Sequence, residues 1–439
     1  MLYKHWKSKE YVTYFLLTLV FLSSWTDING MFSELPQIIL TQPEGWKLGA
    51  FIGLVTNIGN IAPLVLVIIK CTFQKRSINF IPLNYVIILI GMLSCLLLVF
   101  FWQKTSYVFR QNRSISLLIL AFCLSLLDCT SMVTFSDYMT RFRAEFTSAL
   151  FLGESLTTIL PSLLAIAQGN GRLECISVAD NRTSSNTSIV AVYQNARFSV
   201  AVYFLCIFFL LVFSFVAFVL LQWTKVAQNS LQCFSKTSVV FPMNEVTTID
   251  TVNDGNHIRK IDMYTLTSPL YFLLSIGCVY TSSALFGVLL SISAFVLMPY
   301  GHEIFYLGTI LSPWMLSLVW ILGTIKPIVG KRYLLLMILL GTVTFSFDLV
   351  ISFKSPCPPY ANTTKGSVLV LLIWLSTYIL FGYPRLVIAN YVRKHSPNGL
   401  FWFGVHVQLG ALIGSVVAYL FVETFSLFQE RLPCEPIQC

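Results

Sequence analysis

The chain has 439 residues, of which 56% are hydrophobic and only 11% are charged. Ordinary soluble domains carry roughly a quarter of charged residues, and a soluble fold of this length has too few charges here to keep so much apolar surface dissolved. The formal net charge of +9 does not indicate a nucleic-acid partner, because the basic residues stand at the ends of apolar runs instead of gathering on one element. The composition therefore indicates a protein whose solvent is the lipid bilayer.

Eleven apolar runs are long enough, at about 20 residues each, to cross the hydrocarbon core as helices. They cover 11–32, 48–69, 80–102, 115–135, 146–166, 198–221, 270–290, 305–325, 333–353, 367–389 and 401–425. The first run continues too far, and without a small-residue cleavage site, to be a signal peptide, so we interpret it as a retained span. The predicted fold class is all-α, a polytopic membrane protein.

A polar stretch over 222–265 divides these runs into six and five. We interpret the stretch as a cytoplasmic linker without a fold of its own. Residues 1–221 would then form an N-terminal six-helix bundle, and residues 266–439 a C-terminal five-helix bundle with an outer tail. Two bundles around a central site are typical of many secondary transporters.

Charge placement predicts the orientation. With a cytoplasmic N-terminus, 18 of the 28 Lys and Arg residues fall on the inner side, among them Lys4, Arg76 and Arg385. This excess is what the positive-inside rule requires. All N-x-S/T sequons fall on loops that the topology places outside, where glycans are added. They are at Asn112, Asn181, Asn186 and Asn362.

Cysteine placement agrees with this orientation. Cys175, Cys357, Cys434 and Cys439 lie on outer segments, where disulfides can form. A bridge from Cys357 to either of the two tail cysteines would tie the last outer loop to the C-terminal tail, and spacing alone does not choose the partner.

Polar side chains within lipid are costly and need partners, which makes them the first candidates for a substrate site. The first run contains Trp25 and Asn29 and is followed by Glu34. Asn29 precedes a glycine, at a point where a helix can unwind and offer backbone carbonyls. The alternative is that Asp27 and Glu34 lie at the wet interface without a role in binding.

The fourth and fifth runs carry further candidates. Asp128 lies inside an apolar run and is expected to face the bundle interior or water, close to Thr130, Ser131 and Thr134. Glu154 in the fifth run must be paired, hydrated or protonated. Asp128 and Glu154 are therefore candidates for pH-sensitive behaviour or substrate hydrogen bonding, with a structural hydrogen bond between helices as the alternative.

The last run offers Gln408 as a possible ligand group, although interhelical hydrogen bonding is the alternative, and Gly410 and Gly414 are spaced for close helix packing. The sequence contains no H-E-x-x-H, G-x-S-x-G or Walker A motif and no C-x-x-C pair. We therefore predict no enzyme activity, no catalytic residue, no metal site and no cofactor.

Several motifs resemble those of the animal riboflavin transporter family. They are Ser24-Trp25, Asn29-Gly30, Glu34-Leu35-Pro36, Pro43-Glu44-Gly45-Trp46, Asp128-Cys129-Thr130-Ser131, Val133-Thr134-Phe135, Gly153-Glu154, Leu160-Pro161, Ala167-Gln168-Gly169, Ser355-Pro356-Cys357-Pro358 and Gln408-Leu409-Gly410. The resemblance covers most of the chain. It implies an eleven-span plasma-membrane carrier that takes up riboflavin without sodium, with a cytoplasmic N-terminus and an extracellular C-terminus. It also implies a disulfide from Cys357 to Cys434 or Cys439.

The second half departs from the family pattern. The family's Asn-Gly, Leu-Pro and Gln are absent from 285–293, Ser312-Pro313 replaces an Asn-Pro, and Arg385 replaces a Lys. These departures leave another cargo (a nucleoside, a purine or another vitamin) as an alternative, and a non-transporting receptor or sensor as a second one.

The sequence thus predicts a riboflavin carrier that works by alternating access, with a small molecule and the lipid bilayer as its partners. The predicted substrate-binding residues are Trp25, Asn29, Glu34, Thr130, Ser131, Thr134, Glu154 and Gln408, and the predicted proton-sensitive residues are Asp128 and Glu154.

Overall fold

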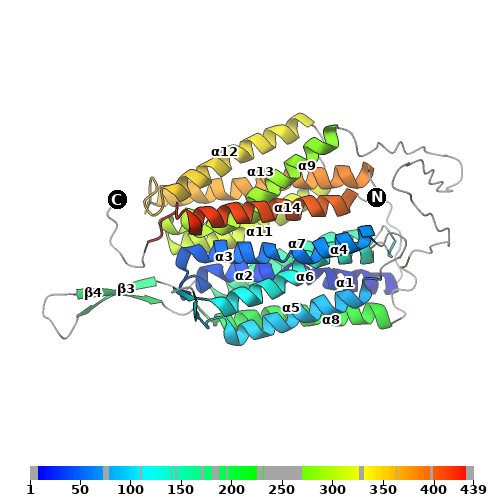
Figure 1. Cartoon of the computed structure of the whole chain (residues 1–439), viewed down its shortest axis with the longest axis horizontal. Coiled ribbons are helices and arrows are strands. Elements are labelled where there is room, and N and C mark those ends of the chain that lie inside the picture. Colours follow the sequence, from blue (N-terminus) through cyan, green and yellow to red (C-terminus); the bar gives the residue numbers. More distant parts are fainter. Residues whose placement is uncertain are drawn as a thin grey trace.

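The computed structural model describes residues 8–72, 79–108, 111–139, 141–143, 146–169, 173–179, 187–193, 196–224, 231, 269–325, 331–361, 363–395 and 399–431. Its long helices lie side by side along one common direction (Figure 1). Lipid offers no hydrogen-bond partner to the backbone, so apolar runs of this length fold as helices that bond internally.

The helices fall into two groups along the sequence. The first helix group comprises α1 (Ser8–Leu22), α2 (Thr26–Ile38), η1 (Gly45–Lys47), α3 (Leu48–Ile58), α4 (Ile61–Thr72), α5 (Ile81–Phe101), α6 (Ile115–Met139), α7 (Thr147–Gln168) and α8 (Val200–Trp223). The second helix group comprises α9 (Pro269–Ser282), η4 (Ser283–Leu289), α10 (Leu290–Leu297), η5 (Met298–Tyr300), α11 (His302–Ile325), α12 (Lys331–Phe353), α13 (Thr364–His395), α14 (Gly399–Tyr419) and η6 (Leu420–Thr424).

Figure 1 shows the second helix group on one side of the molecule and the first on the other. Within the first group, α5 packs against α6 and α8, and α1 against α7 and α8; within the second, α13 packs against α11 and α12, and α14 against α9 and η4. The groups meet where α3 contacts α10 and α14, and where α11 contacts α2 and α7. The predicted bundle boundaries at 221 and 266 remain a prediction, since most of the linker lies outside the described residues.

The predicted all-α membrane class is confirmed, but the count of eleven spans is not. Among the described residues, nine helical segments are long and apolar enough to cross a membrane, and the bent pair α1–α2 makes a tenth. The predicted fifth run is helical as α7 but is not one of these ten.

The first predicted run is not a continuous helix. It forms α1 and α2, whose axes differ by 52°. The hydroxyl of Ser23 donates to the carbonyl of Val20 (2.8 Å), and that of Ser24 donates to the carbonyl of Phe21 (2.7 Å). Hydroxyls that bond the preceding turn in this way compete with the backbone ladder and bend helices. The break therefore lies at residues 23–25, whereas Asn29, where we expected unwinding, is inside α2.

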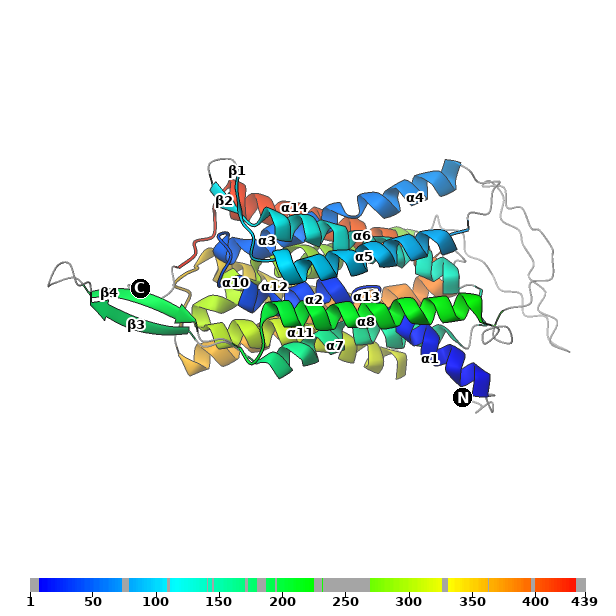
Figure 2. The same cartoon turned by 90° about the horizontal axis from the view of Figure 1, so that it is seen from below.

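Two β-hairpins that the sequence reading did not predict connect the helices. Strand β1 (Ser106–Val108) pairs with β2 (Gln111–Arg113), and β3 (Leu173–Ala179) pairs with β4 (Thr187–Tyr193), both antiparallel. Figure 2 shows the β3–β4 hairpin extending beyond one end of the helices, away from α1. We call this the hairpin end of the molecule. Hairpins fit here because β3 and β4 are rich in β-branched residues.

Helix η4 packs unusually close to α14. A Cβ added at Gly287 would lie 2.5 Å from the Cα of Gly414, and one added at Gly410 would lie 2.3 Å from the carbonyl oxygen of Val279. Only glycine lets two backbones approach so closely. These glycines therefore seat α14 against α9 and η4, and both η4 and α14 contribute to a wall of the cavity described next.

Candidate functional site

A cavity of about 210 Å³ lies between the two helix groups. A single buried water needs only about 15 Å³, so this space suits an organic solute. Its first-group wall comes from α2, α3, α6 and α7, and its second-group wall from η4, α10, α11, α13 and α14, with the N-cap residue of α2 at the edge. Ligand pockets commonly lie between helices of bundles.

The first-group wall contains four of the predicted residues, namely Trp25, Asn29, Asp128 and Glu154. The side-chain amide of Asn29 donates to the hydroxyl (3.3 Å) and carbonyl (3.4 Å) oxygens of Thr157. Asn29 and Glu154 are partly accessible, whereas Asp128 is fully buried. This wall therefore presents amide and carboxyl groups to a solute.

Glu34 is also buried, but it does not line the cavity. Its carboxylate accepts a hydrogen bond of 2.8 Å from the side-chain amide of Gln168, which also donates to the carbonyl of Phe198. This bond joins α2 to the end of α7. Asp27 is buried as well, so neither acid lies at the wet interface that was the alternative placement.

The remaining predicted residues of α6, Thr130, Ser131 and Thr134, are absent from the cavity wall. The hydroxyl of Thr130 is buried without a hydrogen-bond partner among the described residues. The hydroxyl of Ser131 donates to the carbonyls of Asp128 (2.8 Å) and Ser24 (3.3 Å), and that of Thr134 donates to the carbonyl of Thr130 (3.2 Å). All three lie within two helical turns of Asp128, but the cavity meets α6 at Ser125, Asp128, Cys129 and Met132 instead. Their geometry fits helix packing.

The second-group wall is aromatic and carries one cation. Gln408 is the only residue of this half that the sequence predicted to bind substrate, and it does line the cavity. Beside it the structure adds Phe286, Trp374 and Arg385. The indole N–H of Trp374 donates to the hydroxyl of Ser312 at 2.8 Å. The indole is thereby fixed against α11.

Arg385 is the largest departure from the sequence reading. We expected it on the cytoplasmic side, but it is only 6% exposed and lines the cavity. Its guanidinium carbon lies 4.3 Å from the ring centroid of Phe286. The signal that could have found it is a basic residue inside the long apolar run 367–389, since charges within spans usually face the bundle interior.

Polar contacts between helices also join the two groups. The hydroxyls of Thr158 in α7 and Ser317 in α11 lie 2.8 Å apart, and the hydroxyl of Tyr306 donates to the carbonyl of Ala165 at 2.8 Å. These bonds connect α7 directly to α11.

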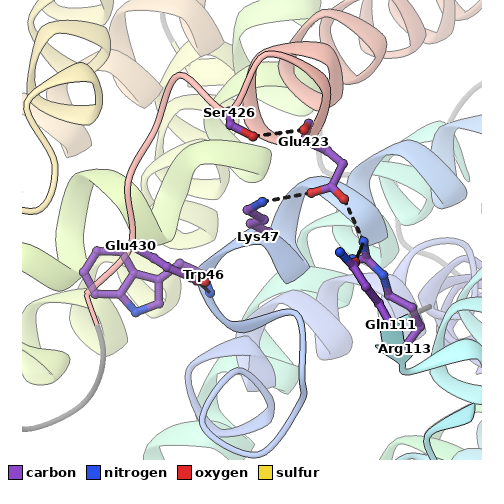
Figure 3. A network of polar contacts seen from close by, with 7 residues as sticks. All are labelled: Trp46, Lys47, Gln111, Arg113, Glu423, Ser426 and Glu430. Atoms are coloured by element: carbon purple, nitrogen blue, oxygen red, sulfur yellow. Dashed lines mark hydrogen bonds and ion pairs between the residues drawn. The ribbon is translucent and has the colours of Figure 1, made fainter. Parts of the chain in front are cut away.

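At the hairpin end, a second set of contacts joins the groups (Figure 3). The carboxylate of Glu423 forms two ion pairs. Lys47 Nζ lies 3.1 Å from one of its oxygens, and Arg113 Nη2 lies 2.7 Å from the other. The backbone N–H of Trp46 donates to Glu430 at 3.0 Å. We call these five residues the hairpin-end network. Lys47, Arg113 and Trp46 belong to the first half of the chain, and both glutamates to the second.

The backbone around this network is adapted to it. Gly45 has a φ of 55°, which favours glycine, and a Cβ there would lie 2.6 Å from Glu430 Oε2. Nearby, the rings of Phe51 and Tyr419 meet edge-on with centroids 5.2 Å apart. At the opposite end, the ion pair of Arg143 with Glu10 lies within the first helix group.

The predicted modification sites are placed only in part. Asn112 lies exposed in β2, whereas Asn181, Asn186 and Asn362 lie outside the described residues. Cys357 is disulfide-bonded. Its expected partners, Cys434 and Cys439, also lie outside the described residues, so the choice between them stays a prediction.

Sequence comparison identifies the family. Residues 9–430 match the family described as solute carrier family 52, riboflavin transporter. The chain belongs to this family. The resemblance seen in the motifs is thereby confirmed, and the family is one of solute transporters rather than enzymes.

Named relatives match over nearly their whole length. The chain is 29% identical to solute carrier family 52, riboflavin transporter, member 3-A of Danio rerio, covering 94% of this chain and 96% of the relative. It is 27% identical to the Homo sapiens member 3, covering 95% and 97%. It is also 27% identical to riboflavin transporter rft-1 of Caenorhabditis elegans, covering 97% and 100%.

Two solved structures share the fold of this family member. One is a bacterial homolog of the human lysosomal transporter Spinster, in an inward-facing and unoccupied conformation, with a TM-score of 0.53 at 12% identity over 96% of this chain and 83% of the other. The second is the nucleoside transporter NupG, with a TM-score of 0.53 at 12% identity over 95% and 92%. The protein thus has the fold of multi-pass membrane transporters.

Proposed function

We propose that this protein carries riboflavin into the cell across the plasma membrane, without sodium and by alternating access. Residues 1–221 and 266–439 act as two bundles joined by the linker 222–265, and the cavity between them holds the substrate. Family membership over residues 9–430 is the observation that carries the choice of substrate.

The cavity supports this choice chemically. A planar isoalloxazine ring needs aromatic or apolar walls, while its carbonyls and the ribityl chain need a few polar groups. Phe286 and Trp374 line the second-group wall, and Asn29 and Glu154 line the first. We assign substrate contact to Trp25, Asn29, Glu154 and Gln408, and we keep Asp128 and Glu154 as the candidates for proton sensitivity. Thr130, Ser131, Thr134 and Glu34, which were predicted as binding residues, are better explained as packing residues.

The hairpin-end network supports alternating access. It joins the two halves of the chain at one end of the cavity through charged contacts, which can break and re-form more readily than buried apolar packing. We propose that this end faces the extracellular side and is closed in this state. Exposed Asn112 of β2 lies at this end, in agreement with the positive-inside orientation. The N-terminus is then cytoplasmic and the C-terminus extracellular.

Uptake of radiolabelled riboflavin by cells that express the chain tests this function. Asn29→Ala and Glu154→Gln are expected to reduce uptake by about 5- to 30-fold, the effect of losing hydrogen bonds in a polar site. Ser131→Ala is the matched control from the same helix group outside the cavity wall, and surface biotinylation normalises the expression. Replacement of sodium by choline is expected to leave uptake unchanged.

Absence of uptake by wild-type protein at the cell surface would contradict the proposal. Competition by excess unlabelled nucleosides or purines would indicate another cargo. Surface binding of riboflavin without accumulation inside the cell would indicate a receptor or sensor.

A further inference from the structure

Arg385 is a buried cation at the cavity wall, and no acidic side chain in the described part of the chain is paired with it. It lies in α13, lines the second-group wall and is 6% exposed. None of the acidic side chains among the described residues forms an ion pair with it, and its Nε has no hydrogen-bond partner there. Guanidinium groups remain charged in proteins, so a positive charge is present at this wall.

The surroundings compensate this charge only in part. The face of Phe286 lies 4.3 Å from the guanidinium carbon, and such a cation–π contact is favourable but weaker than a buried ion pair. Asp128 and Glu154 line the facing wall without forming an ion pair with Arg385. Isolated buried charges are expensive, and charges within membrane spans are usually functional. An unpaired donor at a cavity wall therefore indicates a ligand as the missing partner.

Phe286 also sets the geometry of this donor group. Stacking against the ring orients the planar guanidinium and leaves the N–H groups at its edge for hydrogen bonding. Arginine presents these donors as a rigid fork, which fits two neighbouring acceptors in one plane. A carbonyl oxygen beside an unprotonated ring nitrogen provides such a pair, and the isoalloxazine ring of a flavin carries this arrangement. A polyol chain offers no equivalent pair.

We propose that Arg385, held by Phe286, is a specificity-determining residue that receives the carbonyl–nitrogen edge of a planar heterocycle. This inference rests on the proposed riboflavin transport. It names the part of the substrate that the second helix group contacts. The ribityl chain then faces the first-group wall of Asn29 and Glu154. Lysine, which the family pattern has at this position, would keep the charge without the planar fork, whereas glutamine would remove the charge.

Uptake kinetics of riboflavin in Arg385→Lys and Arg385→Gln, with lumiflavin as a competitor, test the proposal. Lumiflavin has the ring system without the ribityl chain and so reports on ring recognition alone. We expect KM for riboflavin to rise at least 10-fold in Arg385→Gln, in keeping with the loss of a charged hydrogen bond. Arg385→Lys keeps the charge and the family's residue, so its KM should rise less. The inhibition constant of lumiflavin should rise by the same factor, while the maximal rate per surface molecule stays within about 3-fold.

Two further variants separate recognition from folding. Phe286→Leu keeps Arg385 but removes the stacking face, and it is expected to raise both constants by about 3-fold. Arg197→Gln is the control, since Arg197 is exposed and donates to the carbonyl of Ala167 away from the cavity. It should behave like the wild type. If one Arg385 variant fails to reach the surface, the other variant and Phe286→Leu still decide the question.

Two results would overturn the inference while leaving the proposed function intact. One is riboflavin uptake by Arg385→Gln with the wild-type KM. The other is a raised KM together with an unchanged inhibition constant for lumiflavin, which would mean that Arg385 acts elsewhere than at the ring. A wild-type protein at the surface that takes up no riboflavin would instead reject the proposed function, and this inference with it.

Discussion

Glu423→Gln is expected to loosen the closure of the hairpin end. In the structure a single carboxylate receives both Lys47 and Arg113, so one substitution removes two ion pairs while keeping the side-chain shape. Glutamine can still accept a hydrogen bond, but it has no charge to hold two cations. The population with the hairpin end open should therefore increase.

The magnitude follows from the exposure of the pairs. The side chains of Lys47, Arg113 and Glu423 are 27%, 20% and 21% exposed, so each pair is partly screened by water. Exposed ion pairs contribute about 0.2–1 kcal/mol each, and partly buried ones lie toward the upper end of that range. Loss of both should shift the equilibrium by about 1–2 kcal/mol, which corresponds to a change of roughly 5- to 30-fold in the open population.

Labelling of an introduced cysteine measures this shift. Ser291 of α10 is fully buried, and its hydroxyl lies 2.8 Å from where a Cβ on Gly53 of α3 would be. Ser291→Cys should therefore react with an impermeant maleimide only when the two helix groups separate at this end. In that background, Glu423→Gln is expected to raise the labelling rate by roughly 5- to 30-fold. Labelling of the same proteins without Ser291→Cys gives the background from native cysteines.

Three controls make the expectation refutable. Glu303→Gln neutralises an exposed acid of α11 that is in none of the ion pairs of the described residues, and it should leave labelling unchanged. Arg113→Gln should give about half the free-energy effect of Glu423→Gln. The double variant Arg113→Gln/Glu423→Gln should match Glu423→Gln alone, because both remove the same contact. Equal labelling in wild type and Glu423→Gln, or additive effects in the double variant, would refute the role of this carboxylate.

Three other predictions concern packing and modification. Gly287→Ala should destabilise the purified protein by about 1–3 kcal/mol, because the added Cβ would lie 2.5 Å from the Cα of Gly414. Gly404 has open space around it, so Gly404→Ala should leave the stability unchanged. Thermal unfolding of both variants in detergent measures the difference. Asn112→Gln should remove one glycan, seen as a smaller shift on endoglycosidase treatment; an unchanged shift would contradict glycosylation at this site. A non-reducing digest analysed by mass spectrometry should link Cys357 to one of the two tail cysteines, and a link to any other cysteine would contradict that pairing.

Much of the fold follows from the sequence because lipid imposes a simple requirement. A span must be apolar over about 20 residues and must bond its own backbone, so most helical segments were predicted within a few residues of their observed positions. The exceptions are the first run, which forms two helices and ends at Ile38, and the run 270–290, which continues to Tyr300. The family was equally accessible, because motifs such as Asp128-Cys129-Thr130-Ser131 are local in sequence. The bend at residues 23–25 was not predicted, since Ser23 and Ser24 bend a helix only when their hydroxyls bond the preceding turn.

The composition of the cavity was decided by tertiary structure. Helical periodicity tells which residues share a face, but it does not tell what that face meets. Asp128 and Thr130 are two positions apart, yet only Asp128 lines the cavity. Arg385 looked like a residue of the inner membrane boundary, but the packing of α13 against η4 places it at the cavity wall over Phe286.

The sequence by itself therefore determined that the chain spans the membrane repeatedly and belongs among the riboflavin transporters, because hydropathy and motifs are local properties. Only the tertiary structure decided which polar groups meet across the two halves. The pairing of Glu423 with Lys47 and Arg113 joins positions more than 300 residues apart, and no local pattern encodes such a contact. It arises when packed helices bring distant charges to the same end of the molecule.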